Sequence, residues 1–222
     1  MKKHIICLGD SNTHGYCTDP ADSADGILGR FNEEERWPCL LQKLVGDDYL
    51  VIEEGLSGRT TCFQDPAEEG MAAIDYLHPC MKSHKPVALL IIMLGTNDTK
   101  ERFGANPRTI ALGMERLVQK AKATHFWLDQ PNILIVAPAP IGPELEQVDP
   151  DSDMGKGCSE KSFRLAGEFR LVAERNGVHF MDAAAVGAVC NKIDFMHLTR
   201  EGHRNLAKAL ADRVPGMILE EV

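Results

Sequence analysis

Short apolar runs alternate with amphipathic stretches along the whole chain. The apolar runs, rich in β-branched residues, predict five strands, at 4–8, 49–54, 87–94, 132–140 and 178–182. The stretches between them space their apolar residues as amphipathic helices do, and they predict helices at 35–46, 71–84, 107–123, 159–177 and 199–214. Strands that alternate with helices in this way indicate an α/β domain with a parallel sheet.

The runs at 87–94 and 132–140 are almost continuously apolar. Strands of this kind are buried on both faces, with helices on each side of the sheet. We therefore predict a three-layer α/β/α sandwich around a five-stranded parallel sheet. A chain of 222 residues is long enough for one such core, so we expect residues 1–222 to form a single domain.

Three predicted connections are unusually long: 16–34, 55–70 and 139–158. Each follows the carboxyl end of a predicted strand. Ligands bind at that edge of open α/β sheets, so we expect these segments to form pocket walls. The segment 16–34 is also a candidate for contacts between subunits.

Composition and charge narrow the class of protein. Lys and Arg total 24 against 33 Asp and Glu, and the formal charge of −9 argues against a nucleic-acid partner. The apolar runs are too short for a signal sequence or a membrane span, so we expect a cytoplasmic protein without a membrane partner.

No cofactor or metal is indicated by the sequence. The seven cysteines include no C-x-x-C pair, so we expect reduced thiols rather than a disulfide framework or a zinc site. The acidic stretch 144–153 lacks the spacing of a calcium loop, and no G-x-G-x-x-G follows the first predicted strand.

The stretch "GDSNTHG" (9–15) places Ser11 directly after the first predicted strand. Asp and Ser both cap helices well, so a simple strand-to-helix turn explains it. The alternative is that Ser11 is a nucleophile, which requires a base and an oxyanion hole nearby. Asn97 in "LGTNDTK" and Gly58 in "EEGLSGRTT" follow neighbouring predicted strands, although both stretches are also ordinary turn sequences.

A candidate base lies near the end of the chain, in "IDFMHLTREGH" (193–203). Asp194 precedes His197 by three residues, close enough for its carboxylate to orient the imidazole, although a local turn also explains the spacing. His203 is the nearest other histidine, and Asp182 is the rival orienting acid.

Four blocks, "GDSNT", "GLSGRTT", "LGTND" and "DFMHLTREGH", resemble in this order the GDSL/SGNH hydrolase superfamily. "RW" (36–37), "VIEEGLSGRTT" (51–61), "LIIMLGTNDTK" (90–100) and "IALGM" (110–114) are similar to its arylesterase/acyltransferase subgroup, some members of which perform perhydrolysis. The resemblance covers nearly the whole chain and is weakest at 16–34 and 139–158. It implies the flavodoxin-like SGNH hydrolase fold.

The resemblance also implies roles for particular residues. Ser11 matches the nucleophile, His197 the general base and acid, and Asp194 the orienting carboxylate. The Ser11 amide, the Gly58 amide and the Asn97 side chain match the oxyanion donors. The resemblance further implies a homo-oligomer.

Two positions depart from the usual pattern. Asn12 replaces the Leu of the GDSL tetrapeptide, a change that we expect to have little effect on mechanism. Phe195 stands where Gly often follows the Asp. Because Phe195 and Met196 lie between Asp194 and His197, we expect both to contact the substrate.

We therefore predict a serine esterase that hydrolyses, and also transfers, short acyl groups of small carboxylic esters. Alternatives within the superfamily are a carbohydrate O-acetyl esterase and a lysophospholipase or thioesterase. A non-catalytic ligand-binding domain of the same fold would be marked by loss of the Ser, Asn, Asp or His, and all four are present.

Overall fold

The computed structural model describes residues 1–219 and contains one sheet of five parallel strands. The strands are β1 (Lys3–Gly9), β2 (Tyr49–Gly55), β3 (Val87–Met93), β4 (Ile133–Ala137) and β5 (His179–Asp182). Their order is β2-β1-β3-β4-β5, the flavodoxin-like arrangement. The predicted parallel sheet is therefore confirmed. β4 ends three residues before its apolar run does, because Pro138 and Pro140 cannot donate to a strand ladder.

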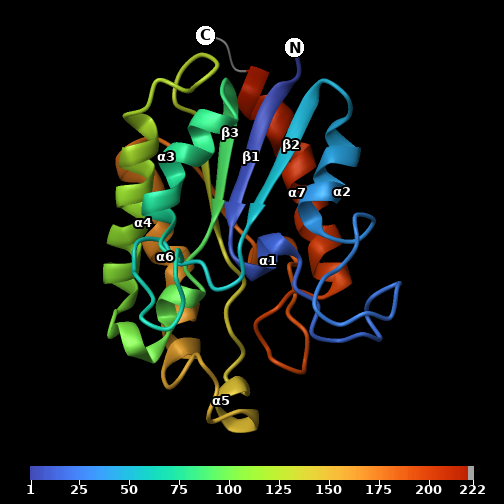
Figure 1. Ribbon diagram of the computed structural model, residues 1–222, viewed down its shortest axis with the longest axis vertical. Helices are drawn as coiled ribbons and strands as arrows, with labels where there is room; N and C mark the ends of the chain where they lie inside the picture. The colour runs from blue at the N-terminus through green and yellow to red at the C-terminus, as the bar shows by residue number, and fades with distance from the viewer. Residues whose placement is uncertain (220–222) are drawn as a thin grey trace.

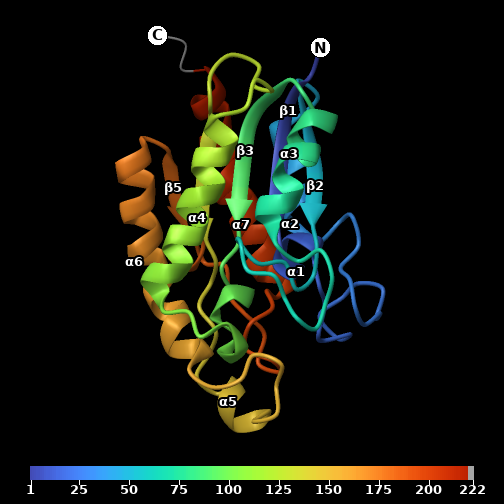
Figure 2. The ribbon, with the colours of Figure 1, turned by 60° about the vertical axis from the view of Figure 1, so that its left-hand side comes forward.

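Helices cover both faces of the sheet (Figures 1 and 2). One face carries α3 (Ala73–Ser83), α4 (Pro107–Lys122) and α6 (Cys158–Asn176). The other carries α2 (Trp37–Val45) and α7 (Arg200–Leu219). The three-layer sandwich is confirmed, and α7 runs past its predicted end at 214, through Pro215.

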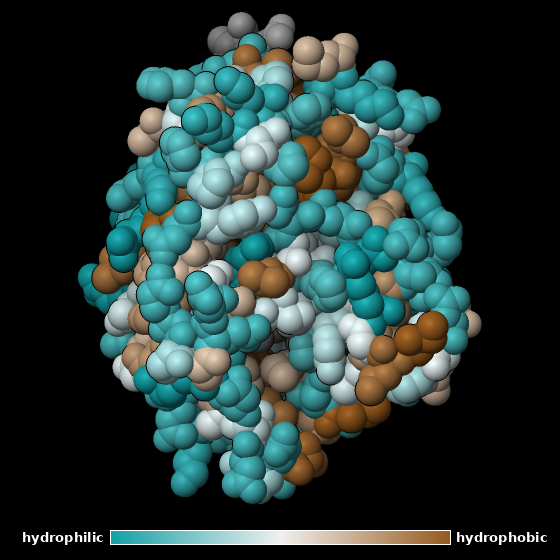
Figure 3. Space-filling view, in the orientation of Figure 1, coloured by the Kyte–Doolittle hydropathy of each residue, from teal (hydrophilic) through white to brown (hydrophobic). Residues whose placement is uncertain are grey.

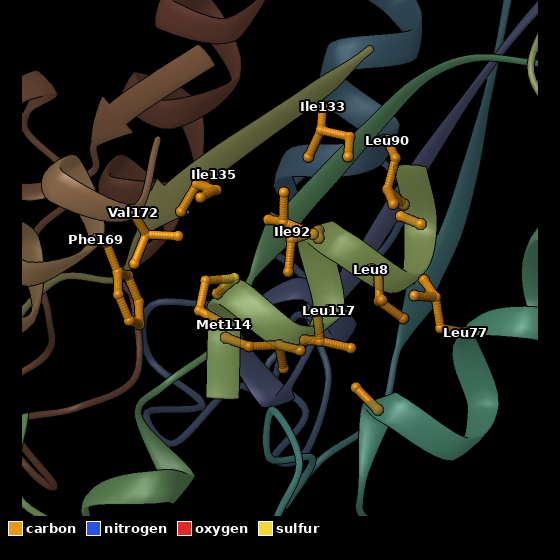
Figure 4. Packing of buried hydrophobic residues seen from close by; sticks show 14 of the residues in the cluster. Leu8, Leu77, Leu90, Ile92, Met114, Leu117, Ile133, Ile135, Phe169 and Val172 are labelled. Atoms are coloured by element: carbon orange, nitrogen blue, oxygen red, sulfur yellow. The ribbon is translucent and has the colours of Figure 1, made fainter. Parts of the chain in front are cut away.

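The two faces of the sheet bury separate apolar clusters. Leu90 and Ile92 of β3 pack towards α3, α4 and α6, together with Leu117 and Phe169 (Figure 4). Leu89 and Ile91 face the cluster formed with α2 and α7. All seven residues of β3 are buried, which explains why its sequence is apolar throughout rather than alternating.

Short helices and loops gather at the carboxyl edge of the sheet (Figure 1). They are α1 (Ser11–His14), η1 (Asn97–Thr99), η2 (Glu101–Phe103), α5 (Leu145–Val148) and η3 (Ala184–Val186). The register pairs Gly9 with both Gly55 and Met93, so the loops after β1, β2 and β3 leave the sheet at the same level. Gly55 lets α1 lie across the end of β2, because a Cβ there would be 2.2 Å from the His14 nitrogen.

The face of the molecule seen in Figure 3 is covered mainly by hydrophilic residues, with smaller hydrophobic groups between them. Across residues 1–219, none of the helices is both long and apolar enough to span a bilayer.

Candidate active site

Ser11 is the first residue of α1, at the carboxyl end of β1. Asp10 caps the turn by accepting a hydrogen bond from the Asn12 N–H at 3.0 Å. Burial raises the pKa of Asp10 to about 6, against the effect of this hydrogen bond and of the nearby His197 and Arg59 charges. The residue that caps α1 is thus Asp10 rather than Ser11, and the Ser11 side chain is free to bond to another residue.

That residue is His197, which lies in the loop before α7. Its Nε2 is 2.9 Å from Ser11 Oγ, and its Nδ1 is 2.7 Å from Asp194 Oδ2. The Tyr16 ring lies against the imidazole with centroids 4.6 Å apart. The structure therefore brings Ser11, His197 and Asp194 into one line of hydrogen bonds, with the Ser11 and His197 residues each 8% exposed.

Several donors hold the Asp194 carboxylate in place. Oδ1 accepts from Asn191 Nδ2 at 2.8 Å and from the Met196 and His197 N–H groups at 3.1 and 3.0 Å, and Oδ2 also accepts from the Thr18 hydroxyl. Burial alone would raise the pKa of Asp194. The hydrogen bonds and the His197 charge outweigh it and hold that pKa well below its usual value.

Gly58 and Asn97 lie beside Ser11, on the wall of the same cleft. Gly58 has a φ of 84°, a conformation that favours glycine. Asn97 Nδ2 donates to the Arg59 carbonyl at 3.1 Å. An amide nitrogen carries two hydrogens, so this bond fixes the Asn97 side chain and leaves a second donor for another oxygen.

Asp98 ties the Gly58 loop to the Asn97 loop. Its buried carboxylate accepts from the Thr61 N–H at 3.0 and 3.1 Å and from the Thr61 hydroxyl. Burial raises the pKa of Asp98 to about 7, despite these hydrogen bonds. Sequence reasoning missed this contact, and its only signal was a charged residue next to Asn97.

The cleft beside Ser11 has a volume of about 260 Å³. All three long connections contribute to its wall, as predicted: Tyr16 comes from the first, Glu68 from the second and Met154 from the third. The remaining lining residues are Ser57, Gly58, Thr96, Asn97, Lys100, Ser152, Asp153, Met196 and His197.

Met196 therefore lines the cleft as expected, but Phe195 does not. Phe195 adopts a φ of 57° and packs on the small apolar cluster that includes Ile141 and Leu145, close to Gly142. Met196 packs against the same cluster but also reaches the cleft. The expectation that Phe195 contacts substrate in this cleft is corrected accordingly.

Asn12, which stands in place of the usual Leu, makes contacts that the sequence did not predict. Its side chain donates from Nδ2 to the Met196 carbonyl at 3.1 Å and accepts the Leu198 N–H at 2.9 Å. A leucine has neither group, so this position connects the α1 turn to the His197 loop.

The rival residues lie elsewhere. His203 is fully buried, its Nδ1 accepts the Trp37 N–H at 3.3 Å, and burial lowers its pKa to about 3, so it is neutral. Asp182 accepts the Ala184 N–H at the end of β5. All seven cysteines are free thiols, as expected.

One group in residues 1–219 has the composition of a metal site: Glu54, Cys80 and His84. Two of its members are hydrogen-bonded, because His84 Nε2 lies 2.7 Å from Glu54 Oε1, and the Tyr76 hydroxyl donates to Glu54 Oε2 at 2.8 Å. The Arg59 guanidinium stacks on the Tyr76 ring beside them. Both carboxylate oxygens of Glu54 are therefore already engaged in hydrogen bonds.

The chain is similar to known proteins along nearly its whole length. The GDSL-like lipase/acylhydrolase family matches residues 7–205. The M. smegmatis aryl esterase structure is 35% identical, covers 97% of this chain and 99% of its own, and has a TM-score of 0.83. Est24, a carbohydrate acetylesterase from Sinorhizobium meliloti, is 35% identical, covers 97% of this chain and 100% of its own, and has a TM-score of 0.84. No curated protein matches the chain.

Proposed function

The chain belongs to the GDSL-like lipase/acylhydrolase family, and from this premise we propose that it is a serine esterase that hydrolyses small esters with short acyl groups. The observation that carries the proposal is the line of hydrogen bonds from Ser11 through His197 to Asp194, beside an open cleft. A nucleophile, a base and an orienting acid in this geometry are the parts that acyl transfer requires.

In the proposed first half-reaction, Ser11 Oγ attacks the ester carbonyl while His197 Nε2 takes its proton. The ionised Asp194 carboxylate accepts from Nδ1, which leaves Nε2 free to act as the base. His197 then gives the proton to the leaving alcohol, and an acyl group remains on Ser11.

Three donors face the developing oxyanion in this proposal: the N–H groups of Ser11 and Gly58 and the second Nδ2 hydrogen of Asn97. Each such donor is worth roughly 3 kcal/mol of transition-state stabilisation in comparable sites. The N-terminal end of α1 also places a partial positive charge near Ser11.

In the second half-reaction, water or another alcohol attacks the acyl-enzyme, and His197 repeats its role in reverse. The balance between hydrolysis and acyl transfer depends on how well the cleft excludes water. We propose that transfer accompanies hydrolysis, as in the subgroup that the sequence resembles.

A carbohydrate O-acetyl esterase is the second candidate function. It is favoured by three polar side chains on the cleft wall, Ser57, Ser152 and Asp153, which can hydrogen-bond to hydroxyl groups. The similarity to the carbohydrate acetylesterase Est24 agrees with it.

An ester panel of varied acyl length, run in water and with added alcohol, tests the proposal. We expect hydrolysis of short acyl esters, a transfer product when alcohol is present, and covalent labelling of Ser11 by an organophosphonate. Acetylated sugars in the same panel separate the two candidates. Preference for long acyl chains, or labelling of another residue, would overturn the first.

We further propose that copies of the chain form a homo-oligomer through the 16–34 segment. Ile27 and Leu28 are adjacent on this segment and are 59% and 60% exposed, so together they offer an apolar contact to a second copy. Light scattering tests this assembly: a monomer at all concentrations would contradict it, and Ile27→Ser should shift an oligomer towards smaller species.

A further inference from the structure

The Asn12 side chain hydrogen-bonds to the backbone on both sides of His197. Its Nδ2 donates to the Met196 carbonyl at 3.1 Å, and its Oδ1 accepts the Leu198 N–H at 2.9 Å. Asn12 is 3% exposed, so water does not compete for these groups. The Asn12 side-chain amide thus hydrogen-bonds to the backbone of the residues before and after His197, the candidate base.

Asn12 is itself fixed to the turn that carries Ser11. Its N–H donates to Asp10 Oδ1 at 3.0 Å, and it follows Ser11 directly in α1. The remaining hydrogen bonds around Asp194 and His197 come mainly from their own loop, through Asn191. Asn12 therefore connects two segments 184 to 186 residues apart at the point where a proton must pass between them.

We propose that Asn12 is a positioning residue that sets the distance and angle between His197 and Ser11. This inference rests on the proposed function. Proton transfer depends steeply on geometry, and a misplacement of about 1 Å can cost on the order of 100-fold in rate. The Leu that the GDSL pattern usually carries here would leave the Leu198 N–H and the Met196 carbonyl without these partners.

The test compares Asn12→Leu with Asn132→Leu in the full chain. Asn132 is a matched control because its Nδ2 also makes two hydrogen bonds, to the Ala88 and Met217 carbonyls, both at 3.0 Å. It lies just before β4, at the opposite edge of the sheet from Ser11. Both variants should lose stability, but only Asn12→Leu should change the chemistry.

For Asn12→Leu we expect kcat on a short acyl ester to fall about 10- to 100-fold per folded molecule, with KM nearly unchanged. Asn12→Asp keeps the acceptor for the Leu198 N–H, so it should recover part of kcat. It should also move the acidic limb of the pH profile upwards, because a carboxylate near His197 favours the imidazolium.

An unchanged kcat per folded molecule in Asn12→Leu, or equal losses in Asn12→Leu and Asn132→Leu, would overturn the inference. Circular dichroism and thermal unfolding supply the folded fraction. Failure of the proposed function itself looks different, because wild-type protein would then hydrolyse no ester or would be labelled away from Ser11.

A second, independent observation concerns Glu68, which lines the cleft on the Gly58 side. Its Oε2 lies 3.1 Å from the point where a Cβ on Gly58 would stand, so the carboxylate is next to a candidate oxyanion donor. Throughout residues 1–219, no side chain or backbone group forms an ion pair or hydrogen bond with this carboxylate.

The charges at the Lys100 end of the cleft cancel. Lys100 Nζ lies 2.7 Å from Asp153 Oδ2 and 3.4 Å from Asp65 Oδ2, and Arg102 pairs with both aspartates from the outside. Two cations and two carboxylates thus neutralise one another. Glu68, which is exposed to solvent, is left as the unpaired carboxylate on the cleft wall.

A negative charge here opposes an oxyanion, unless the substrate brings a compensating positive charge. We infer that Glu68 makes the cleft select esters whose alcohol part is cationic over esters whose alcohol part is anionic. This too rests on the proposed esterase function. The overall charge of −9 adds long-range attraction for cations.

Three phenyl acetates of similar shape test the selection: an uncharged one, one with a 3-trimethylammonium group and one with a 3-sulfonate group. After correction for their rates of hydroxide hydrolysis, we expect kcat/KM for the cation to exceed that for the anion about 5- to 10-fold at low salt. Glu68→Gln should bring the ratio towards one, and the neighbouring Glu69→Gln should not.

A ratio that Glu68→Gln leaves unchanged, or that falls equally in Glu69→Gln, would overturn the selection. The uncharged ester keeps the two proposals separate, because its hydrolysis reports the esterase activity whatever the charge preference. Glu68→Gln should make that hydrolysis faster, since it removes a repulsive charge beside the oxyanion.

Discussion

Ser11 Oγ lies 2.9 Å from His197 Nε2, although the two residues are 186 positions apart in the chain. The contact forms because the turn after β1 and the loop before α7 meet at the carboxyl edge of the sheet (Figure 1). Asp194 is held ionised and can only accept hydrogen bonds, so His197 Nδ1 carries the hydrogen between them. Nε2 is then the acceptor that faces Ser11.

Asp194→Asn should lower kcat about 10,000-fold, because an amide at this position favours the wrong tautomer of His197. Ser11→Ala should reduce hydrolysis at least as far. Steady-state kinetics on a short acyl ester measure both. Asp182→Asn is the matched control, since Asp182 hydrogen-bonds only to the nearby Ala184 N–H, and it should keep wild-type kcat.

Asn97→Ala should lower kcat roughly 100- to 1,000-fold and change KM little, because the oxyanion donor acts mainly in the transition state. Asn205→Ala serves as the control, since that side chain donates to the Gly187 carbonyl and does not line the cleft. Equal kcat values in the two variants would remove Asn97 from the oxyanion hole.

The main candidate residues could be predicted from the sequence because each sits next to a strand end or within one short loop. The carboxyl ends of parallel strands lie at one edge of the sheet. Ser11, Gly58 and Asn97, which follow three such strands, are therefore expected to lie close together. The contacts of Asn12 and Thr18, which span 176 to 186 residues, could not be predicted, because no local pattern encodes them and the family resemblance gives these two side chains no role. The direction of the Phe195 side chain could not be predicted either, because it depends on the left-handed φ that this residue adopts in the folded loop.

Asp98→Asn should flatten the dependence of stability on pH. Burial raises the pKa of Asp98 from 3.8 to about 7, so the folded protein holds a proton that the unfolded chain releases. The contribution of Asp98 to the free energy of unfolding is therefore greatest below about pH 4 and is lost as the pH rises towards 7, by about 1.4 kcal/mol per pKa unit.

Asn keeps an acceptor for the Thr61 N–H but does not titrate. Denaturant unfolding at about pH 5 and about pH 8 measures the effect, and the stability of Asp98→Asn relative to wild type should increase between them. Asp10 also has a raised pKa, and its charge contributes to the raised pKa of Asp98, so Asp10 changes the size of the difference but not its sign. A difference that stays constant across this range would show that Asp98 does not hold the proton.

Phe195→Gly should be more stable than Phe195→Ala, the reverse of the usual order. Both substitutions remove the ring from the cluster around Ile141 and Leu145, so they lose the same packing. Only glycine relieves the left-handed φ of 57°, which costs a non-glycine residue about 1–2 kcal/mol. Glycine loses about 0.5–1 kcal/mol more backbone entropy than alanine on folding, so a net difference of up to about 1.5 kcal/mol should remain.

Denaturant unfolding of the two variants measures this difference directly, because the lost side-chain contacts are shared. The carbonyl of residue 195 accepts the Gly142 N–H at 2.8 Å, and this backbone bond should survive in both. Glycine at position 195 should also preserve the distance between Asp194 and His197, because the loop keeps its backbone conformation. The kcat of Phe195→Gly should therefore exceed that of Phe195→Ala. A more stable Phe195→Ala would contradict this prediction. It would mean that residue 195 can change to a negative φ at no cost in stability, so that the loop between Asp194 and His197 does not require the left-handed conformation.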